Sequence, residues 1–361
     1  MKPIHFAFTG LGAIAKTHIV ALRAMPVIQK APFMPVLDTL VTRNPDGNRE
    51  QALAMGFQRV TNSLNEALTN PALHIVDICT PNAMHFTEGT AAASAGKAIY
   101  FEKPLTEAYS RTEELMNQIP ANTLQQVALV YRYHPAVMKM KAILQEGIIG
   151  DVLQCNCSYL RSGYLNAERP VSWRLNDTLS GGGAITDLGI HVIDLIAHLF
   201  GELTDVHGET NIFVKERPKA QGSDERVQMT VDDWASFFYT TKSGVRGTGE
   251  VSRIAWGSDR FSVQIVGTRG SITCDLEKDI TPKVSMLSGA TPALPVPSSL
   301  QLIPNDKTTM GVFVDSHFGA LNHFLHRYIG EDAWANEGLA PTMKDAAHAE
   351  MWIDRILRSK A

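Results

Sequence analysis

The stretch "IHFAFTGLGAIAKTHIVALRAM" (residues 4–25) decides the fold. An apolar strand leads through a glycine-rich turn into an apolar helix. In a Rossmann turn, Gly10 would permit the tight bend, Gly12 would let the backbone approach a pyrophosphate, and the small Ala15 would allow close helix–strand packing. The first amides of the helix would face phosphate oxygens. The stretch predicts dinucleotide binding; a plain tight turn is the alternative.

The first third of the chain repeats this alternation of strand and helix. Strands are expected at residues 4–8, 35–42, 74–81, 97–104 and 125–131. Helices are expected at residues 13–25, 48–56 and 86–96. Short strands separated by helices of this length predict βαβ units and an N-terminal Rossmann domain with a doubly wound parallel sheet.

Beyond Gly150 the strands become longer, and hairpin-like "KSG" and "TRG" turns join several of them. A helix near 180–200 would pack on the mainly antiparallel sheet that they form. Two late stretches, "HFGALNHFLHRYI" and "TMKDAAHAEMWIDRILRS", are expected to be helices. The fold class is therefore α/β, with a C-terminal α+β domain after the Rossmann domain.

Composition limits the functional class. The 361 residues suggest two domains, and the net charge of -4 gives no electrostatic reason to expect nucleic acid or an anionic membrane as a partner. The sequence contains no run of 18 apolar residues, so a membrane-spanning helix is not expected. The first residues do not resemble a secretory signal. With four cysteines and no disulfide framework, we expect a reduced, cytoplasmic protein. Cys155 and Cys157 lack partners that would make a zinc site.

The end of the second strand bears on cofactor preference. A fold that prefers NAD usually carries an acidic residue here for the ribose 2′-hydroxyl. This chain has Thr42, Arg43 and Asn44 instead, while Asp38 lies in mid-strand. Arg43 could face a 2′-phosphate or stack on adenine, or it could be a solvated loop residue. NAD and NADP both remain open.

Two further segments carry candidate catalytic groups. "YFEKPL" (100–105) places Lys103 at the carboxyl end of a parallel strand, where α/β sheets bind ligands. "SGGGAITDLGIHVIDLIAHLFG" (180–201) opens with glycines, which would let the chain approach a ligand closely. Asp187, His191, Asp194 and His198 share one face of the helix that follows. We expect Asp194 to anchor that helix and His198 to be a core or interdomain histidine.

"GLGAIA", "TPNAMH", "EKPL", "YRYHP", "SWR" and "GGGAITDLGIHVIDL" occur in this order, and the chain resembles the Gfo/Idh/MocA oxidoreductase family from residue 4 to about 270. The resemblance implies a Rossmann domain (1–132), a substrate-binding and oligomerisation domain with a large open sheet (133–340), and a C-terminal helix (341–361) packing back near the Rossmann domain. It implies hydride transfer between NAD or NADP and a carbinol of a sugar, cyclitol or related polyol. It also implies a cis bond before Pro104.

The resemblance assigns site residues by motif. The catalytic residues would be Lys103, Asp187 and His191. The cofactor would contact Gly10, Gly12, Ala13, Ile14, Thr42, Arg43, Thr80, Pro81, Asn82, His85, Glu102 and Lys103. The substrate would contact Lys103, Arg132, Trp173, Arg174, Asp187 and His191.

The chemistry requires such groups. Oxidation of an alcohol needs a base near the hydroxyl with a pKa close to the working pH, which suits His191. Lys103 would place a positive charge beside the developing alkoxide. Asp187 would bind a neighbouring hydroxyl or orient His191. The reverse division, with Lys103 as the base, stays open.

Two other functions fit part of the pattern. Asp187, His191 and Asp194 have a spacing compatible with a divalent ion in a metal-dependent hydrolase, although the glycine turn and "EKPL" then lack a role. A catalytically silent, dinucleotide-binding regulator of the same fold is the second alternative. No metal is expected for the dehydrogenase. The strands from Val231 to Asp275 would expose a broad apolar sheet face, so we expect a homodimer or homotetramer.

Overall fold

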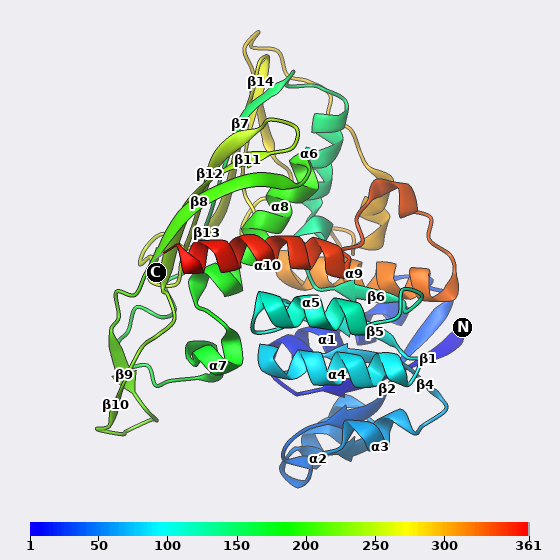
Figure 1. Cartoon of the computed structure of the whole chain (residues 1–361). Helices are drawn as coiled ribbons and strands as arrows, with labels where there is room; N and C mark the ends of the chain where they lie inside the picture. The colour runs from blue at the N-terminus through cyan, green and yellow to red at the C-terminus, as the bar shows by residue number, and fades with distance from the viewer. Residues whose placement is uncertain (360–361) are drawn as a thin grey trace. The chain divides into compact units, whose positions relative to one another are not determined.

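The computed structural model describes residues 1–359, which form two compact units, each with its own sheet and core (Figure 1). Unit 1 comprises Met1–Thr106, Ser110–Tyr133 and Gln301–Met343. Unit 2 comprises Glu107–Tyr109, His134–Leu300 and the segment from Lys344 onward.

Unit 1 is built on a six-stranded parallel sheet in the order β3-β2-β1-β4-β5-β6. The strands are β1 (Lys2–Thr9), β2 (Phe33–Val41), β3 (Arg59–Thr61), β4 (Leu73–Ile78), β5 (Ala98–Phe101) and β6 (Gln125–Val127). The helices are α1 (Ala13–Ile28), α2 (Pro45–Met55), α3 (Leu64–Leu68), α4 (Asn82–Ser94), α5 (Tyr109–Gln118, whose first residue belongs to unit 2) and α9 (Val312–Ile329).

The sheet of unit 1 is covered on both faces. Consecutive residues Phe6, Ala7 and Phe8 of β1 are all fully buried, as expected where helices cover both sides of a parallel sheet. The strand order reverses between β1 and β4, which creates the switch point at which open α/β sheets bind ligands. The predicted Rossmann architecture is therefore confirmed.

Some boundaries differ from the predictions. The sequence pattern predicts neither β3 nor α3, because elements of 3 and 5 residues are too short to show a period. The strand expected at 125–131 ends at Val127, and a 3₁₀ turn follows at Val130–Tyr133. The strand expected at 97–104 ends at Phe101, so Lys103 follows it by two residues.

Unit 2 contains a seven-stranded sheet in the order β15-β14-β13-β7-β12-β11-β8, antiparallel except between β12 and β7. Its strands are β7 (Val152–Leu160), β8 (Leu203–Asn211), β11 (Trp234–Thr241), β12 (Arg246–Ser252), β13 (Arg260–Gly267), β14 (Gly270–Asp275) and β15 (Lys283–Met286). A ribbon of β9 (Glu216–Pro218) and β10 (Arg226–Gln228) stands apart. The helices are α6 (Pro135–Gln145), α7 (Asp177–Ser180), α8 (Ile190–Phe200) and α10 (Met343–Arg358).

One face of this sheet forms the core of unit 2. Phe261, Val263 and Ile265 alternate along β13 and are all buried, and Figure 1 shows α6 and α8 on one side of the sheet. The predicted mainly antiparallel sheet with a packed helix is confirmed. Cys155 and Cys157 both lie on the buried face of β7, as the two-residue spacing predicts.

The opposite face corrects an expectation. Neighbouring strands align Phe238, Thr248, Asn156, Gln264 and Thr273 in one row across this face. The next row aligns Ser236, Glu250, Ser158, Ser262 and Asp275. Phe238, which is 67% exposed, is the apolar exception in these two rows. The broad apolar face expected between Val231 and Asp275 is therefore wrong, because the outward positions carry polar side chains.

The C-terminal third divides differently from the expected domains. Residues 301–343, including α9, belong to unit 1, where α9 packs on α1. The segment from Lys344 onward, with nearly all of α10, belongs to unit 2. Phe318, Leu321 and Phe324 of α9 are fully buried. The sequence shows that this face of α9 is apolar, but it does not show which sheet the face packs on.

One helical stretch is long and apolar enough to cross a membrane by length and composition, within the residues that the structure describes. It spans Asp177–Phe200, and 78% of its most apolar window is buried inside the protein. Core helices pass the same test, and the burial of this stretch identifies it as a core helix of unit 2.

Candidate active site

The glycine turn leads from β1 into α1 as predicted. Gly10 has a φ of +84°, and a side chain there would press on the carbonyl oxygen of Cys79, so both conformation and space require glycine. Gly12 caps α1 without a side-chain hydrogen bond, and an added Cβ would meet nothing within 4 Å. The first amides of α1, at Ala13 and Ile14, therefore open onto free space, which fits the diphosphate of a dinucleotide.

The end of β2 offers polar groups but no carboxylate for a ribose. Thr42 Oγ1 accepts a hydrogen bond from Asn48 (2.9 Å), and the Asn44 side chain caps α2 by accepting from the Gly47 amide (3.1 Å). Arg43 is exposed. Asp38 is buried in mid-strand, as expected, and its carboxylate is already engaged by His5, Asn70 and Arg59.

The turn after β4 connects to the lysine segment through His85. This fully buried histidine has Nδ1 at 2.9 Å from the Pro104 carbonyl oxygen and Nε2 at 2.9 Å from that of Thr80. Burial lowers its pKa, so the ring is neutral near pH 7 and one nitrogen donates at a time. His85 connects the two loops through these contacts. The cofactor contact that the resemblance implies for His85 stays a prediction.

Other groups of this turn lie at the same edge of the sheet. Thr80 Oγ1 and Thr9 Oγ1 both donate to Glu88 Oε2, at 2.6 and 2.7 Å. Pro81 precedes α4, whose first residue, Asn82, is buried. Backbone contacts thus bring the glycine turn, the threonine–proline turn and Pro104 to the carboxyl edge of one sheet.

Lys103 stands just after β5 at this edge. The peptide bond between Lys103 and Pro104 is cis, as the resemblance implies. The amide of Lys103 donates to Oε2 of Glu102 (3.2 Å), and the Glu102 side chain is largely buried. Arg132, expected at the substrate, is buried in the 3₁₀ turn after β6.

In unit 2, the glycines before the helix that carries Asp187 and His191 pack closely against other segments. Gly181 and Gly182 have positive φ angles of +69° and +156°. A Cβ on Gly181 would overlap the Glu107 carbonyl, and one on Gly183 would overlap the Asp232 carbonyl. The expectation that these glycines bring the chain close to a ligand is corrected, because the close neighbours are other parts of unit 2.

Asp232 holds this glycine segment in place. Its buried carboxylate accepts hydrogen bonds from the amides of Gly183 and Ile185, both at 2.8 Å. Burial raises the pKa of Asp232, while these amides and the charge of Arg253 oppose the shift. The clamp fixes the start of a π-helical turn, Ile185–Gly189, which contains Asp187 and runs into α8. Such turns inside helices are frequent at functional sites.

Asp187 and His191 differ in surroundings. The Asp187 side chain is 27% exposed, and its Oδ2 accepts from the Arg253 guanidinium at 3.1 Å. His191 is 8% exposed, with the Tyr159 ring 6.4 Å away. Asp194 lies deeper on α8 and is buried. His198 has Nδ1 at 3.4 Å from the Lys141 ammonium of α6, inside the same unit.

Arg253 contacts the candidate residue Asp187, and the sequence does not reveal this contact. It is 2% exposed, and besides Asp187 it contacts the Arg174 carbonyl oxygen (3.3 Å) and lies 5.0 Å from the centre of the Tyr164 ring. A buried guanidinium that donates to a partly exposed carboxylate fixes the position of that carboxylate. In the sequence, Arg253 is a single arginine that follows β12, and no motif marks it.

Trp173 and Arg174 form a short 3₁₀ turn, Trp173–Leu175. Arg174 stacks on Trp173, with its guanidinium carbon 4.4 Å from the ring centre, and both are half-buried. Arg253 ties the main chain of this turn to Asp187. Four of the expected substrate residues therefore lie in unit 2: Trp173, Arg174, Asp187 and His191. Arg253 contacts two of them, Arg174 and Asp187.

Potential metal ligands gather elsewhere. Among residues 1–359, two sets of donor atoms lie within 4.8 Å of one another: His18 with Asp77 and Cys79, and His18 with Glu102 and His317. The set proposed for a hydrolase, Asp187 with His191 and Asp194, is not among them.

Comparisons with known proteins agree with this architecture. Residues 4–129 match the family model "Oxidoreductase family, NAD-binding Rossmann fold", and residues 137–273 match "GFO/IDH/MocA C-terminal domain". Levoglucosan dehydrogenase of Pseudarthrobacter phenanthrenivorans is 32% identical over 292 residues, covering 77% of this chain and 75% of that protein.

Solved structures give the same result over the whole chain. A levoglucosan dehydrogenase in complex with NADH and L-sorbose has a TM-score of 0.89 and 28% identity, covering 99% of this chain and 97% of that one. The complex with NADH and levoglucosan has a TM-score of 0.88 and 27% identity, covering 100% and 98%. The chain belongs to the Gfo/Idh/MocA family of NAD-binding oxidoreductases.

Proposed function

We propose that the protein is an NAD(P)-dependent dehydrogenase that interconverts a carbinol and a carbonyl on a sugar, cyclitol or related polyol. The observation that carries the proposal is the position of Lys103, two residues after β5 at the carboxyl edge of the sheet. The N-terminus of α1, which follows Gly12, lies at the same edge. The relatives support the substrate class, since solved levoglucosan dehydrogenases hold NADH with levoglucosan or L-sorbose.

The proposed mechanism assigns each proton and charge to a residue. Bound nicotinamide supplies hydride acceptance or donation. His191 removes the hydroxyl proton during oxidation and returns it during reduction, a role that suits an imidazole near neutral pH. Lys103 stabilises the negative charge that develops on the same oxygen.

Asp187 serves the substrate in this mechanism. Because Arg253 donates to Oδ2, the carboxylate has a fixed position. It would accept a hydrogen bond from a hydroxyl next to the reacting carbon, while Trp173 and Arg174 contact the rest of the sugar. The proposal requires Lys103 and His191 to meet at one hydroxyl.

For the cofactor, we propose use of NAD(H) with tolerance of NADP(H). Arg43 is exposed after β2, where Thr42, Arg43 and Asn44 occupy the positions at which NAD-preferring folds usually carry an acidic residue. The nearest carboxylate on β2, Asp38, is engaged by its own neighbours.

We also propose a cytoplasmic homodimer or homotetramer. The two central rows of the outer sheet face of unit 2 carry mostly uncharged side chains, with Glu250 and Asp275 within them and Glu209 and Lys283 at their ends. Interface centres are poor in charged residues, so this face is suited to pairing with a second copy through polar contacts around Phe238. Monomeric light scattering at assay concentration would contradict this proposal.

The test is a panel of anhydrosugars, sugars and polyols with NAD⁺ and NADP⁺, followed through the absorbance of reduced nicotinamide. Lys103→Met and His191→Ala should abolish turnover while leaving NADH binding nearly intact. Their matched controls are the exposed residues Lys307→Met and His207→Ala. Full turnover in both active-site variants would refute the mechanism. NADH binding without turnover on any substrate would favour the silent regulator.

A further inference from the structure

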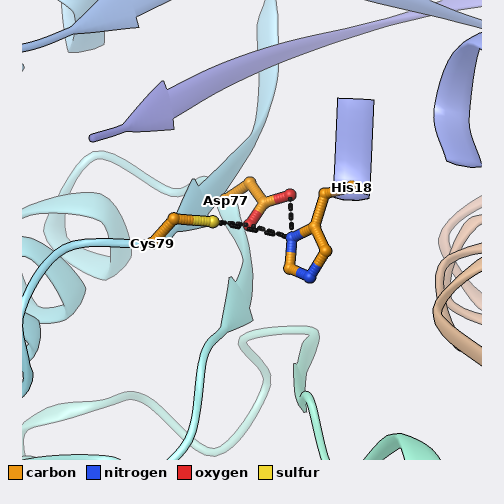
Figure 2. Close-up of side chains that lie close together, drawn as sticks. All are labelled: His18, Asp77 and Cys79. Atoms are coloured by element: carbon orange, nitrogen blue, oxygen red, sulfur yellow. Dashed lines mark hydrogen bonds and ion pairs between the residues drawn. The ribbon is translucent and has the colours of Figure 1, made fainter. Parts of the chain in front are cut away.

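A buried charged cluster in unit 1 lies outside the catalytic assignments. Figure 2 shows His18, from α1, pointing at Asp77 of β4 and beside Cys79. The His18 ring is 0% exposed, and its Nδ1 lies 3.1 Å from both carboxylate oxygens of Asp77. Cys79 donates its thiol proton to Asp77 Oδ1 over 3.2 Å.

The other ring nitrogen of His18 faces the lysine segment. Its Nε2 lies 3.2 Å from Glu102 Oε1 and 3.1 Å from His317 Nδ1 of α9. Tyr100 packs edge-on against the ring, with centroids 5.4 Å apart. Since Glu102 Oε2 accepts the Lys103 amide, a continuous path runs from Asp77 through His18 and Glu102 to Lys103.

The charges of this path are balanced by His18. Burial alone would lower its pKa, but the charge and hydrogen bond of Asp77 and those of Glu102 raise the pKa to about 10. His18 is therefore an imidazolium between two carboxylates. Its Nδ1 hydrogen-bonds with Asp77, while its Nε2 hydrogen-bonds with His317 Nδ1 and forms an ion pair with Glu102. Burial, with the charges of Asp77 and Glu102, raises the pKa of Cys79 well above its usual range, so it is a thiol.

Two sets of donor atoms around His18 lie close enough together to hold a metal ion, and a metal there would have to displace protons from these groups. Metal analysis of the purified protein therefore distinguishes a bound metal from the protonated cluster.

We propose that His18 is a positioning residue for the reaction: clamped by Asp77, its imidazolium holds the Glu102 carboxylate and thereby sets the place of Lys103. The inference rests on the proposed role of Lys103. The ion pair with His18 keeps the Glu102 carboxylate turned toward the interior. Glu102 Oε2 in turn accepts from the main-chain amide of Lys103 and fixes the backbone of that residue. Displacing a catalytic group by about 1 Å can lower the rate up to about a hundredfold.

His18→Gln removes the cation and leaves two buried carboxylates without their partner. His18→Gln/Asp77→Asn removes one positive and one negative charge, so the net charge of the cluster returns to that of the native protein. His326→Gln, a half-buried histidine of α9 outside the cluster, is the matched control. Activity is measured at a temperature where each variant is fully folded by circular dichroism.

We expect His18→Gln to lower both the melting temperature and kcat, with kcat down about tenfold or more. The sugar KM and the NADH dissociation constant should change less than kcat. The double variant should recover melting temperature while its kcat stays low, because Glu102 still lacks its imidazolium.

Recovery of kcat together with stability in the double variant would overturn the inference, since charge balance alone would then explain His18. A stoichiometric metal in purified protein, found by mass spectrometry and lost in His18→Gln, would also overturn it. Lys103→Met distinguishes a failure of the proposed role of Lys103 from a failure of the inference about His18. If the native protein turns over no substrate, the proposed function fails; if Lys103→Met keeps full turnover, the proposed role of Lys103 fails. If it abolishes turnover while His18→Gln does not lower kcat, the inference about His18 alone fails.

Discussion

The clamp at Asp232 offers a sharp test of how unit 2 positions its catalytic helix. Asp232→Asn keeps the shape of the side chain but replaces one accepting oxygen by a donor. One of the two 2.8 Å bonds, to the Gly183 or Ile185 amide, is then lost, and a buried N–H faces an NH₂ group. Losing a charged hydrogen bond and leaving a buried donor unpaired costs about 2–4 kcal/mol.

The functional effect follows from the position of the clamp. Ile185 begins the π-helical turn that carries Asp187, and His191 follows in the first turn of α8. A shift at the start of this segment moves both groups, so kcat/KM should fall about ten- to a hundredfold. Stability is measured by urea unfolding, and kcat/KM on whichever sugar the panel identifies.

Asp233 provides a matched control beside it. Its carboxylate accepts from the amides of Phe213 and Val214 at 2.8 to 3.1 Å, so it clamps a different loop. Asp233→Asn should lose a similar free energy of unfolding but keep most of its kcat/KM. Equal losses of activity in the two variants, or native activity in Asp232→Asn, would refute the reasoning.

Three other changes test separate parts of the account. Arg253→Met should lower kcat/KM about tenfold or more because Asp187 loses its partner, with Arg253→Lys intermediate and the exposed Arg260→Met unaffected; equal kinetics in all three would contradict this. Arg43→Asp should shift the ratio of kcat/KM values about tenfold toward NAD⁺ over NADP⁺, and an unchanged ratio would show that Arg43 does not face the 2′ position. For His18, the folded-state pKa of about 10 lies above the ordinary 6.5, so its stabilisation is complete below about pH 6.5 and is lost as pH rises through 10. The loss is on the order of a few kcal/mol; the melting temperature of the native protein should fall more steeply from pH 7 to 10 than that of His18→Gln, and parallel curves would contradict the assignment.

The features that the sequence predicts well are local ones. The turn at Gly10 and Gly12, the alternation of buried strands and helices, and the lysine after β5 each depend on neighbours within about ten residues. Their residue types report directly on backbone conformation and burial. The Rossmann architecture and the mainly antiparallel second sheet were therefore predictable, with errors at boundaries, at the short elements β3 and α3, and at α5 and α6, which were not predicted.

The features that it predicts poorly are contacts between distant segments. Asp232 meets the glycine segment and Arg253 meets Asp187 only after the strands of unit 2 have paired. Gly181 appears from sequence to make room for a ligand, yet it makes room for the main chain at Glu107. The cluster around His18 joins α1, β4, the end of β5 and α9, four segments that no local pattern connects.

The most direct test of the central claim is a crystal structure of the protein with NADH and a sugar that it turns over. The account predicts that Lys103 Nζ and a ring nitrogen of His191 both lie about 3 Å from one hydroxyl of that sugar, on the carbon facing the nicotinamide. A complex in which the ammonium and the imidazole contact different ligands, or lie on opposite sides of the protein, would contradict it.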